Sequence, residues 1–117
     1  MAVTQKNSLG KIEYSDEFLS NLAGVATMDC YGIVGMSSQK AMDGIVELLK
    51  GTNLNKGIKI STNENAVSIH LFVIVEYGVS MSAVASNVMD TVKYRVEKFT
   101  GLTVDKVDVT INGIRVE

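Results

Sequence analysis

The stretch from Ala66 to Glu76 alternates between two kinds of side chain more regularly than any other part of the sequence. One set of positions is aliphatic throughout: Val67, Ile69, Leu71, Val73 and Val75. The intervening set is mixed: Ser68, His70, Phe72, Ile74 and Glu76. Because successive side chains of a strand point to opposite faces, the aliphatic set predicts a strand with one face in the core. The mixed set predicts a second, partly covered face.

The sequence on either side of this stretch predicts a partner strand and a covering helix. Gly57–Ser61 also alternates, and the turn residues 62–65 join it to the main strand, which favours a hairpin. Met81–Phe99 carries apolar residues at steps of three and four, so we expect a long helix packed on the aliphatic face. Val104–Asn112 alternates again and predicts the last strand.

The N-terminal part of the chain predicts one short strand and one helix. Residues 1–9 are polar, and we expect a flexible segment there. Gly10–Tyr14 alternates and predicts a short strand. Ser15 has the character of an N-cap for a helix over Asp16–Met28, whose first turn is acidic and so complements the helix dipole.

The middle of the chain predicts a further helix. Gly32–Met36 is a glycine-bracketed apolar run, consistent with a short strand or a buried turn. Gln39–Lys50 has an apolar stripe at helical spacing and predicts the second of three helices. We therefore expect a single domain over residues 10–117, an α+β two-layer sandwich with a small antiparallel or mixed sheet and about three helices on one face.

Charge and cysteine content narrow the function classes. The 117-residue chain has 11 basic and 13 acidic residues, so its net charge of -2 gives no reason to expect nucleic acid as a partner. A single cysteine excludes an internal disulfide and fits a reducing, cytoplasmic location. Leu71–Val75, the longest strongly apolar stretch, is far too short to cross a bilayer. We expect no direct membrane insertion, and any peripheral membrane contact would need another protein.

The residues that could carry chemistry lack the partners that such chemistry needs. His70 has no evident nucleophile or carboxylate near it in the sequence pattern. Cys30 follows Asp29, whose charge opposes thiolate formation, so a buried core role is the better interpretation. Asp43 and Glu47 could share a metal at i, i+4, but without a third ligand they fit a solvated helix face. We predict no catalytic residue, no cofactor and no metal.

Two further patterns have a structural and a functional interpretation. Gly32–Gly35 matches the GxxG of KH domains, but its Ile-Val interior cannot pair with phosphate, which leaves RNA binding there as a weak alternative. Asp105 and Asp108 flank Lys106 in the last strand, where charges oppose edge-to-edge pairing.

Three stretches occur together, in order, at a characteristic spacing: Asp16–Ala26 closed by Tyr31–Met36, Lys56–Ile60 with Glu76–Met81, and Phe99–Leu102 followed by Val107–Ile114. Their combination resembles the alkaline shock protein family of envelope-stress proteins, and in particular its short, YloU-like members. The resemblance implies a cytosolic protein of Gram-positive bacteria, linked to envelope and alkaline stress, without established enzymatic activity. It also implies self-association and binding to a membrane-embedded partner.

The leading hypothesis is therefore a non-enzymatic scaffold or interaction protein that self-associates and binds a partner. The alternative is a regulatory accessory subunit of a metabolic or membrane-associated enzyme. Phe72 and Ile74, together with His70, lie on the mixed face of the main strand and are the predicted interaction surface.

Overall fold

The computed structural model describes residues 2–38, 48–49, 57–63 and 66–116. Its elements follow the chain in this order: β1 (Ala2–Asn7), β2 (Gly10–Ser15), α1 (Asp16–Met28), β3 (Ile33–Ser37), β4 (Leu48–Leu49), β5 (Ile58–Asn63), β6 (Ala66–Glu76), α2 (Met81–Thr100) and β7 (Thr103–Arg115).

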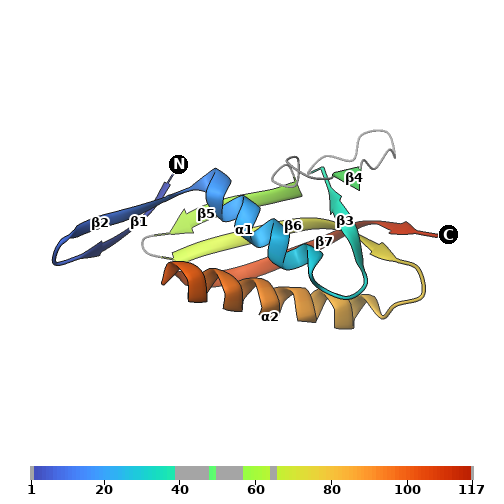
Figure 1. Ribbon diagram of the computed structural model, residues 1–117. Coiled ribbons are helices and arrows are strands. Elements are labelled where there is room, and N and C mark those ends of the chain that lie inside the picture. Colours follow the sequence, from blue (N-terminus) through green and yellow to red (C-terminus); the bar gives the residue numbers. More distant parts are fainter. Residues whose placement is uncertain (1, 39–47, 50–56, 64–65, 117) are drawn as a thin grey trace.

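Strand β6 is the centre of the main sheet (Figure 1). Its first half pairs antiparallel with β5, from Ala66 opposite Asn63 to Leu71 opposite Ile58. Its second half pairs antiparallel with β3 on the same side, and β4 adds a short strand beyond β3. The other side of β6 is parallel to β7 along its whole length. The predicted hairpin of β5 and β6 is confirmed, and the sheet is mixed.

Gly57 lies where β3 and β5 meet end to end beside β6. A Cβ atom at this position would come within 2.5 Å of the backbone oxygen of Ser37 and 3.3 Å of the backbone oxygen of Phe72. Real Cβ atoms do not approach so closely, and backbone oxygens of paired strands cannot move aside cheaply. Glycine is therefore required at the junction of the two strands.

Both helices cover one face of the main sheet, with α1 over β3 and β5 and α2 over β7 (Figure 1). The aliphatic set predicted from β6 is buried in the core between the helices and the sheet. From α2 the core takes four valines spaced by four residues: Val84, Val88, Val92 and Val96. This spacing keeps the valines on one side of the helix, so the long helix packs on the face that the sequence indicated.

Local side-chain hydrogen bonds fix the ends of both helices. Ser15 is the N-cap of α1, and its Oγ accepts from the backbone N–H of Phe18 at 3.1 Å, as predicted. Ser80 caps α2 in the same way. Gly101 ends α2 in the left-handed conformation with φ of 75°, and its N–H donates to the Glu97 carbonyl at 2.9 Å.

Strands β1 and β2 form a separate two-stranded sheet that extends beyond the main sheet (Figure 1). We expected a flexible segment over residues 1–9, whereas residues 2–7 form β1. Asn7 shapes the turn, since its Oδ1 accepts from the N–H groups of Leu9 and Gly10. At the base of the hairpin, the Tyr14 hydroxyl donates to the Thr100 carbonyl at 2.9 Å and ties the hairpin to the end of α2.

The expected fold class is wrong in its architecture. The chain was expected to form one small sheet with about three helices on one face, but the part that the structure describes contains two helices and two sheets. The helix predicted over Gln39–Lys50 lies outside the described residues except for Leu48–Leu49, which form strand β4. The second sheet went unrecognised because β1 is polar and carries no aliphatic alternation.

Candidate partner-binding surface

The sequence-predicted interaction residues lie on the face of the main sheet that points away from the helices. The rings of His70 and Phe72 are stacked with centroids 4.3 Å apart, and both side chains are half-buried. His70 Nε2 lies 2.6 Å from Thr110 Oγ1 on the neighbouring strand β7. Ile74 is only 7% exposed. Much of this predicted surface is thus already in contact with the chain itself.

A hydrogen bond crosses β6 on the same face. Asn112 Nδ2 donates to Ser37 Oγ at 2.9 Å, although Asn112 belongs to β7 and Ser37 to β3, on opposite sides of β6. Asn112 is the extra residue of a β-bulge, which aims its side chain across the sheet. The bond passes over the Phe72–Ile74 segment, so a polar bridge interrupts the apolar part of this face.

Cys30 and His70 are on opposite faces of the sheet and share no site. Cys30 is buried in the core beside α1, and its Sγ donates to the Ala26 carbonyl at 3.4 Å, which confirms its predicted core role. Asp43 and Glu47 lie outside the described residues. In the ranges that the structure describes, no three histidine, cysteine, aspartate or glutamate side chains gather to hold a metal ion.

The Gly32–Gly35 segment is not an exposed nucleic-acid loop. Ile33 to Gly35 belong to β3, where Ile33 is opposite Val75 of β6. The Gly32 carbonyl accepts from the N–H of Glu76 at 2.9 Å, which continues the contact between these two segments. The backbone that a KH loop would offer to phosphate is used here within the sheet.

A surface hollow of about 430 Å³ lies where the loop after α1 meets the turn between β6 and α2. It is lined by Tyr31, Gly78, Val79, Ser80, Ala83, Val84 and Asn87, and we call it the Tyr31 hollow. The Tyr31 side chain is 77% exposed at its edge. Sequence reasoning did not predict this site.

Two glycines shape the Tyr31 hollow. Gly32 has φ of 86°, and a Cβ there would lie 2.7 Å from Val84 Cγ2, so glycine lets the loop approach the first turns of α2. Gly78 also lines the hollow and has φ of 95°, but a Cβ there would face open space, so glycine is favoured at this position by the turn conformation and not by a close contact. Arg95 Nη1 and Asp29 Oδ2, 2.6 Å apart, join α2 to the end of α1 nearby.

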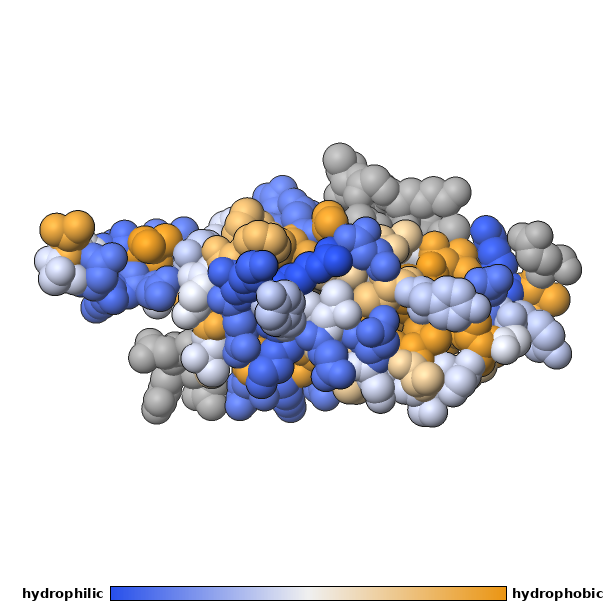
Figure 2. Space-filling model, turned by 60° about the horizontal axis from the view of Figure 1, so that its bottom comes forward, coloured by the Kyte–Doolittle hydropathy of each residue, from blue (hydrophilic) through white to orange (hydrophobic). Residues whose placement is uncertain are grey.

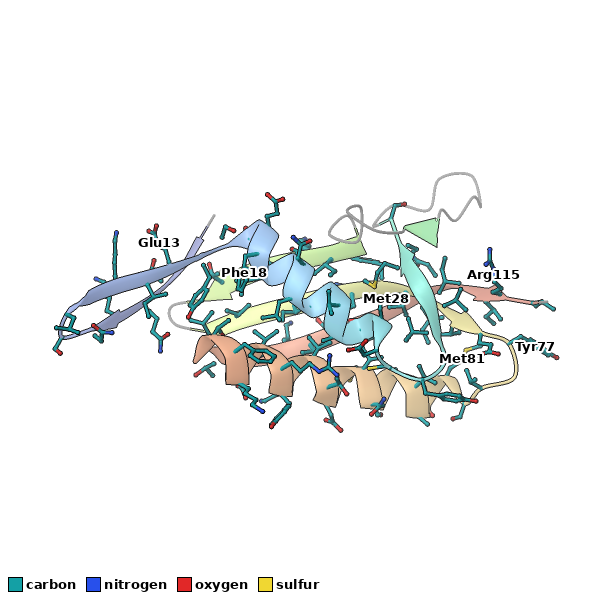
Figure 3. All side chains as sticks on the ribbon, viewed as in Figure 1. Glu13, Phe18, Met28, Tyr77, Met81 and Arg115 are labelled. Carbon is teal, nitrogen blue, oxygen red and sulfur yellow. The ribbon has the colours of Figure 1, made fainter. Side chains whose placement is uncertain are left out.

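Exposed apolar side chains occur at helix ends that are close in sequence to the lining of the Tyr31 hollow. Met28 at the end of α1 and Met81 at the start of α2 are partly exposed, and Met81 and Tyr77 lie toward the same end of the molecule (Figure 3). Figure 2 shows hydrophobic side chains gathered at this end, whereas the rest of α2 presents mostly polar side chains. An apolar hollow with tyrosine at its edge and few titratable groups is suited to bind an apolar side chain of another protein.

The helices give no sign of a membrane span. Within the described ranges, neither is both long and apolar enough to cross a bilayer.

Comparison with known proteins gives one family and several relatives. The model of the alkaline shock protein 23 family, described as having a cell envelope-related function, matches residues 4–116. The chain is 38% identical over 117 residues to the uncharacterized protein YloU of Bacillus subtilis, covering 99% of this chain and 98% of the relative. It is 32% identical to the uncharacterized protein Spy1614 of Streptococcus pyogenes, covering 99% and 97% respectively. No solved structure matches.

Proposed function

Because the chain belongs to the alkaline shock protein 23 family, whose function is related to the cell envelope, we propose that it is a non-enzymatic interaction protein of the envelope stress response. It acts in the cytoplasm by binding a protein partner and by associating with itself. The partner is a membrane-embedded protein, which brings the chain to the inner side of the envelope.

The Tyr31 hollow is the observation that supports partner binding. Tyrosine is enriched among the residues that dominate binding energy, because it offers a large rigid surface with a polar tip. Met81 directly follows Ser80 of the lining, is partly exposed, and is flexible enough to fit a partner of irregular shape.

Site-specific photo-crosslinking in cells tests this proposal. A photo-crosslinking residue at position 31 should capture one protein reproducibly, and Met81→Asp should abolish that capture because it puts a charge directly after Ser80 of the hollow's lining. The matched control is position 94 on α2, where Tyr94 is 61% exposed and has Lys98 Nζ 5.5 Å from its ring. We expect no specific capture from position 94.

Growth under alkaline stress gives the second measurement. Tyr31→Ala should fail to restore growth to cells lacking the protein, whereas Tyr94→Ala should restore it, since both changes remove an exposed tyrosine without disturbing the core. Full complementation by Tyr31→Ala together with no capture at position 31 would contradict the proposal. Capture of a soluble enzyme would favour the alternative, an accessory regulatory subunit.

A further inference from the structure

We propose that two copies of this chain pair through the free side of β7, antiparallel and about a two-fold axis at residue 107. In this dimer Lys106 of each copy lies opposite Asp108 of the other. The inference rests on the self-association part of the proposed function and names the surface responsible. It does not involve the Tyr31 hollow.

Strand β7 presents a long unpaired side. It runs along the whole of β6, and in the described part of the chain β6 is the strand with which it pairs. A strand paired on one side leaves a row of N–H and C=O groups available to a further strand. With 13 residues, β7 is about twice as long as β5, the 6-residue strand on the opposite side of β6.

Two bulges define the regular part of this edge. The register against β6 shifts at Asp105 and again at Asn112, so Lys106–Ile111 remains as an unbroken run between them. Bulges bend a strand and stop pairing from continuing past them. With the two-fold axis at residue 107, positions 106–108 of each copy lie opposite one another inside this run, and the pairs farther out reach the bulge at Asp105, which favours a limited, reversible contact.

The charges on this run are complementary to themselves. Lys106 and Asp108 share the face away from the helices, with Lys106 Nζ 3.7 Å from Asp108 Oδ2, and their side chains are 63% and 52% exposed. In antiparallel pairing centred on Val107, Lys106 of each copy lies opposite Asp108 of the other, so the dimer contains two such pairs. Directly opposed residues of antiparallel strands interact, and opposite charges there are stabilising. The sequence alone indicated that these charges oppose pairing, but their alternating sign favours pairing with an identical strand.

The free edge of β5 lacks this property. On the face away from the helices, β5 carries the charged residue Lys59. The strand contains no acidic residue that could pair with it. Two β5 strands could not form opposite-charge pairs with each other. Within the main sheet, charge complementarity therefore favours β7 and a second copy of the same chain.

Charge reversals test the pairing by sedimentation equilibrium of the full chain. Lys106→Asp alone makes both cross-strand pairs acidic, and Asp108→Lys alone makes both basic. Each should weaken the dimer about tenfold, because two attractive pairs become repulsive. The double variant K106D/D108K restores opposite charges and should return the dissociation constant to that of the wild type.

Strand β2 offers a matched control. Lys11 Nζ and Glu13 Oε2 lie 3.6 Å apart at the same i, i+2 spacing and with similar exposure, 62% and 55%. Lys11→Asp changes net charge by the same amount as Lys106→Asp and should leave the dimer unchanged. Circular dichroism of each variant checks that the native fold is retained.

The outcomes separate the two levels of the proposal. A wild-type chain that stays monomeric at high concentration overturns self-association and the β7 dimer together. If the wild type self-associates and the charge reversals at Lys106 and Asp108 leave its dissociation constant unchanged, the β7 surface alone is overturned. Loss of self-association in Lys11→Asp would overturn the β7 surface in the same way. Open-ended oligomers instead of dimers would indicate β7-to-β5 pairing and also contradict a two-fold contact.

Discussion

Replacing Gly32 by alanine should destabilise this protein for two separable reasons. The first is the backbone conformation, because φ of 86° costs a residue with a Cβ about 1–2 kcal/mol. The second is steric, because the new Cβ would lie 2.7 Å from Val84 Cγ2. Val84 is nearly buried and its β-branched side chain has few alternative rotamers, so overpacking adds roughly 1–3 kcal/mol. We expect the free energy of unfolding to fall by about 2–5 kcal/mol in total.

Gly78→Ala separates the two contributions. Gly78 also has positive φ, at 95°, but a Cβ there would meet no atom within 4 Å. This variant should lose only the backbone contribution of about 1–2 kcal/mol. The difference between the Gly32 and Gly78 variants therefore measures the steric contact with α2.

Urea unfolding followed by circular dichroism provides the free energies, and a double-mutant cycle tests the steric contact directly. Val84→Ala removes two buried methyl groups and should cost about 1.6 kcal/mol or more. Adding Gly32→Ala to Val84→Ala should cost less than adding it to the wild type, by about 1 kcal/mol, because the clashing methyl is gone. Equal losses for the Gly32 and Gly78 variants, or strict additivity in the cycle, would refute this reasoning.

Three other substitutions test the packing. Gly57→Ala should lower the free energy of unfolding, measured with urea, by roughly 2 kcal/mol or more, because its Cβ would lie 2.5 Å from the Ser37 backbone oxygen. A decrease of less than about 0.5 kcal/mol would contradict the tight contact between Gly57 and Ser37. Tyr14→Phe removes the hydrogen bond to the Thr100 carbonyl, so hydrogen exchange should quicken in residues 2–15; unchanged exchange would show that the bond does not hold the hairpin. Thr100→Val deprives the buried Leu102 N–H of its acceptor and should lower unfolding free energy by about 1–3 kcal/mol, whereas Thr100→Ser should keep most of it.

The elements that could be predicted are those with local signals. The boundaries expected for α1, Asp16 and Met28, are the observed ones, because Ser15 caps the helix and its apolar spacing is regular. The hairpin of β5 and β6 was predictable because alternation and a turn signal agree. Strand β1 was not, since its polar residues give no periodic apolar signal.

Features that depend on distant contacts could not be predicted. The sequence gives no reason for β3 and β5 to share one side of β6, because both are short strands of similar composition. The Tyr31 hollow exists because Gly32 lets Val84 approach, and these residues are far apart in the chain. Tyr31 and Tyr77 could be identified only as parts of a family pattern.

The junction of β3 and β5 at Gly57 has a consequence for how this family can vary. Ser37 ends β3 and Gly57 directly precedes β5, and these two points touch, while Leu48–Leu49 between them pairs with β3 as β4. A connection with adjacent ends can change in length at small entropic cost without altering strand register. New sequence can thus be acquired here during evolution, or inserted by design, while β6 and its neighbours keep their pairing.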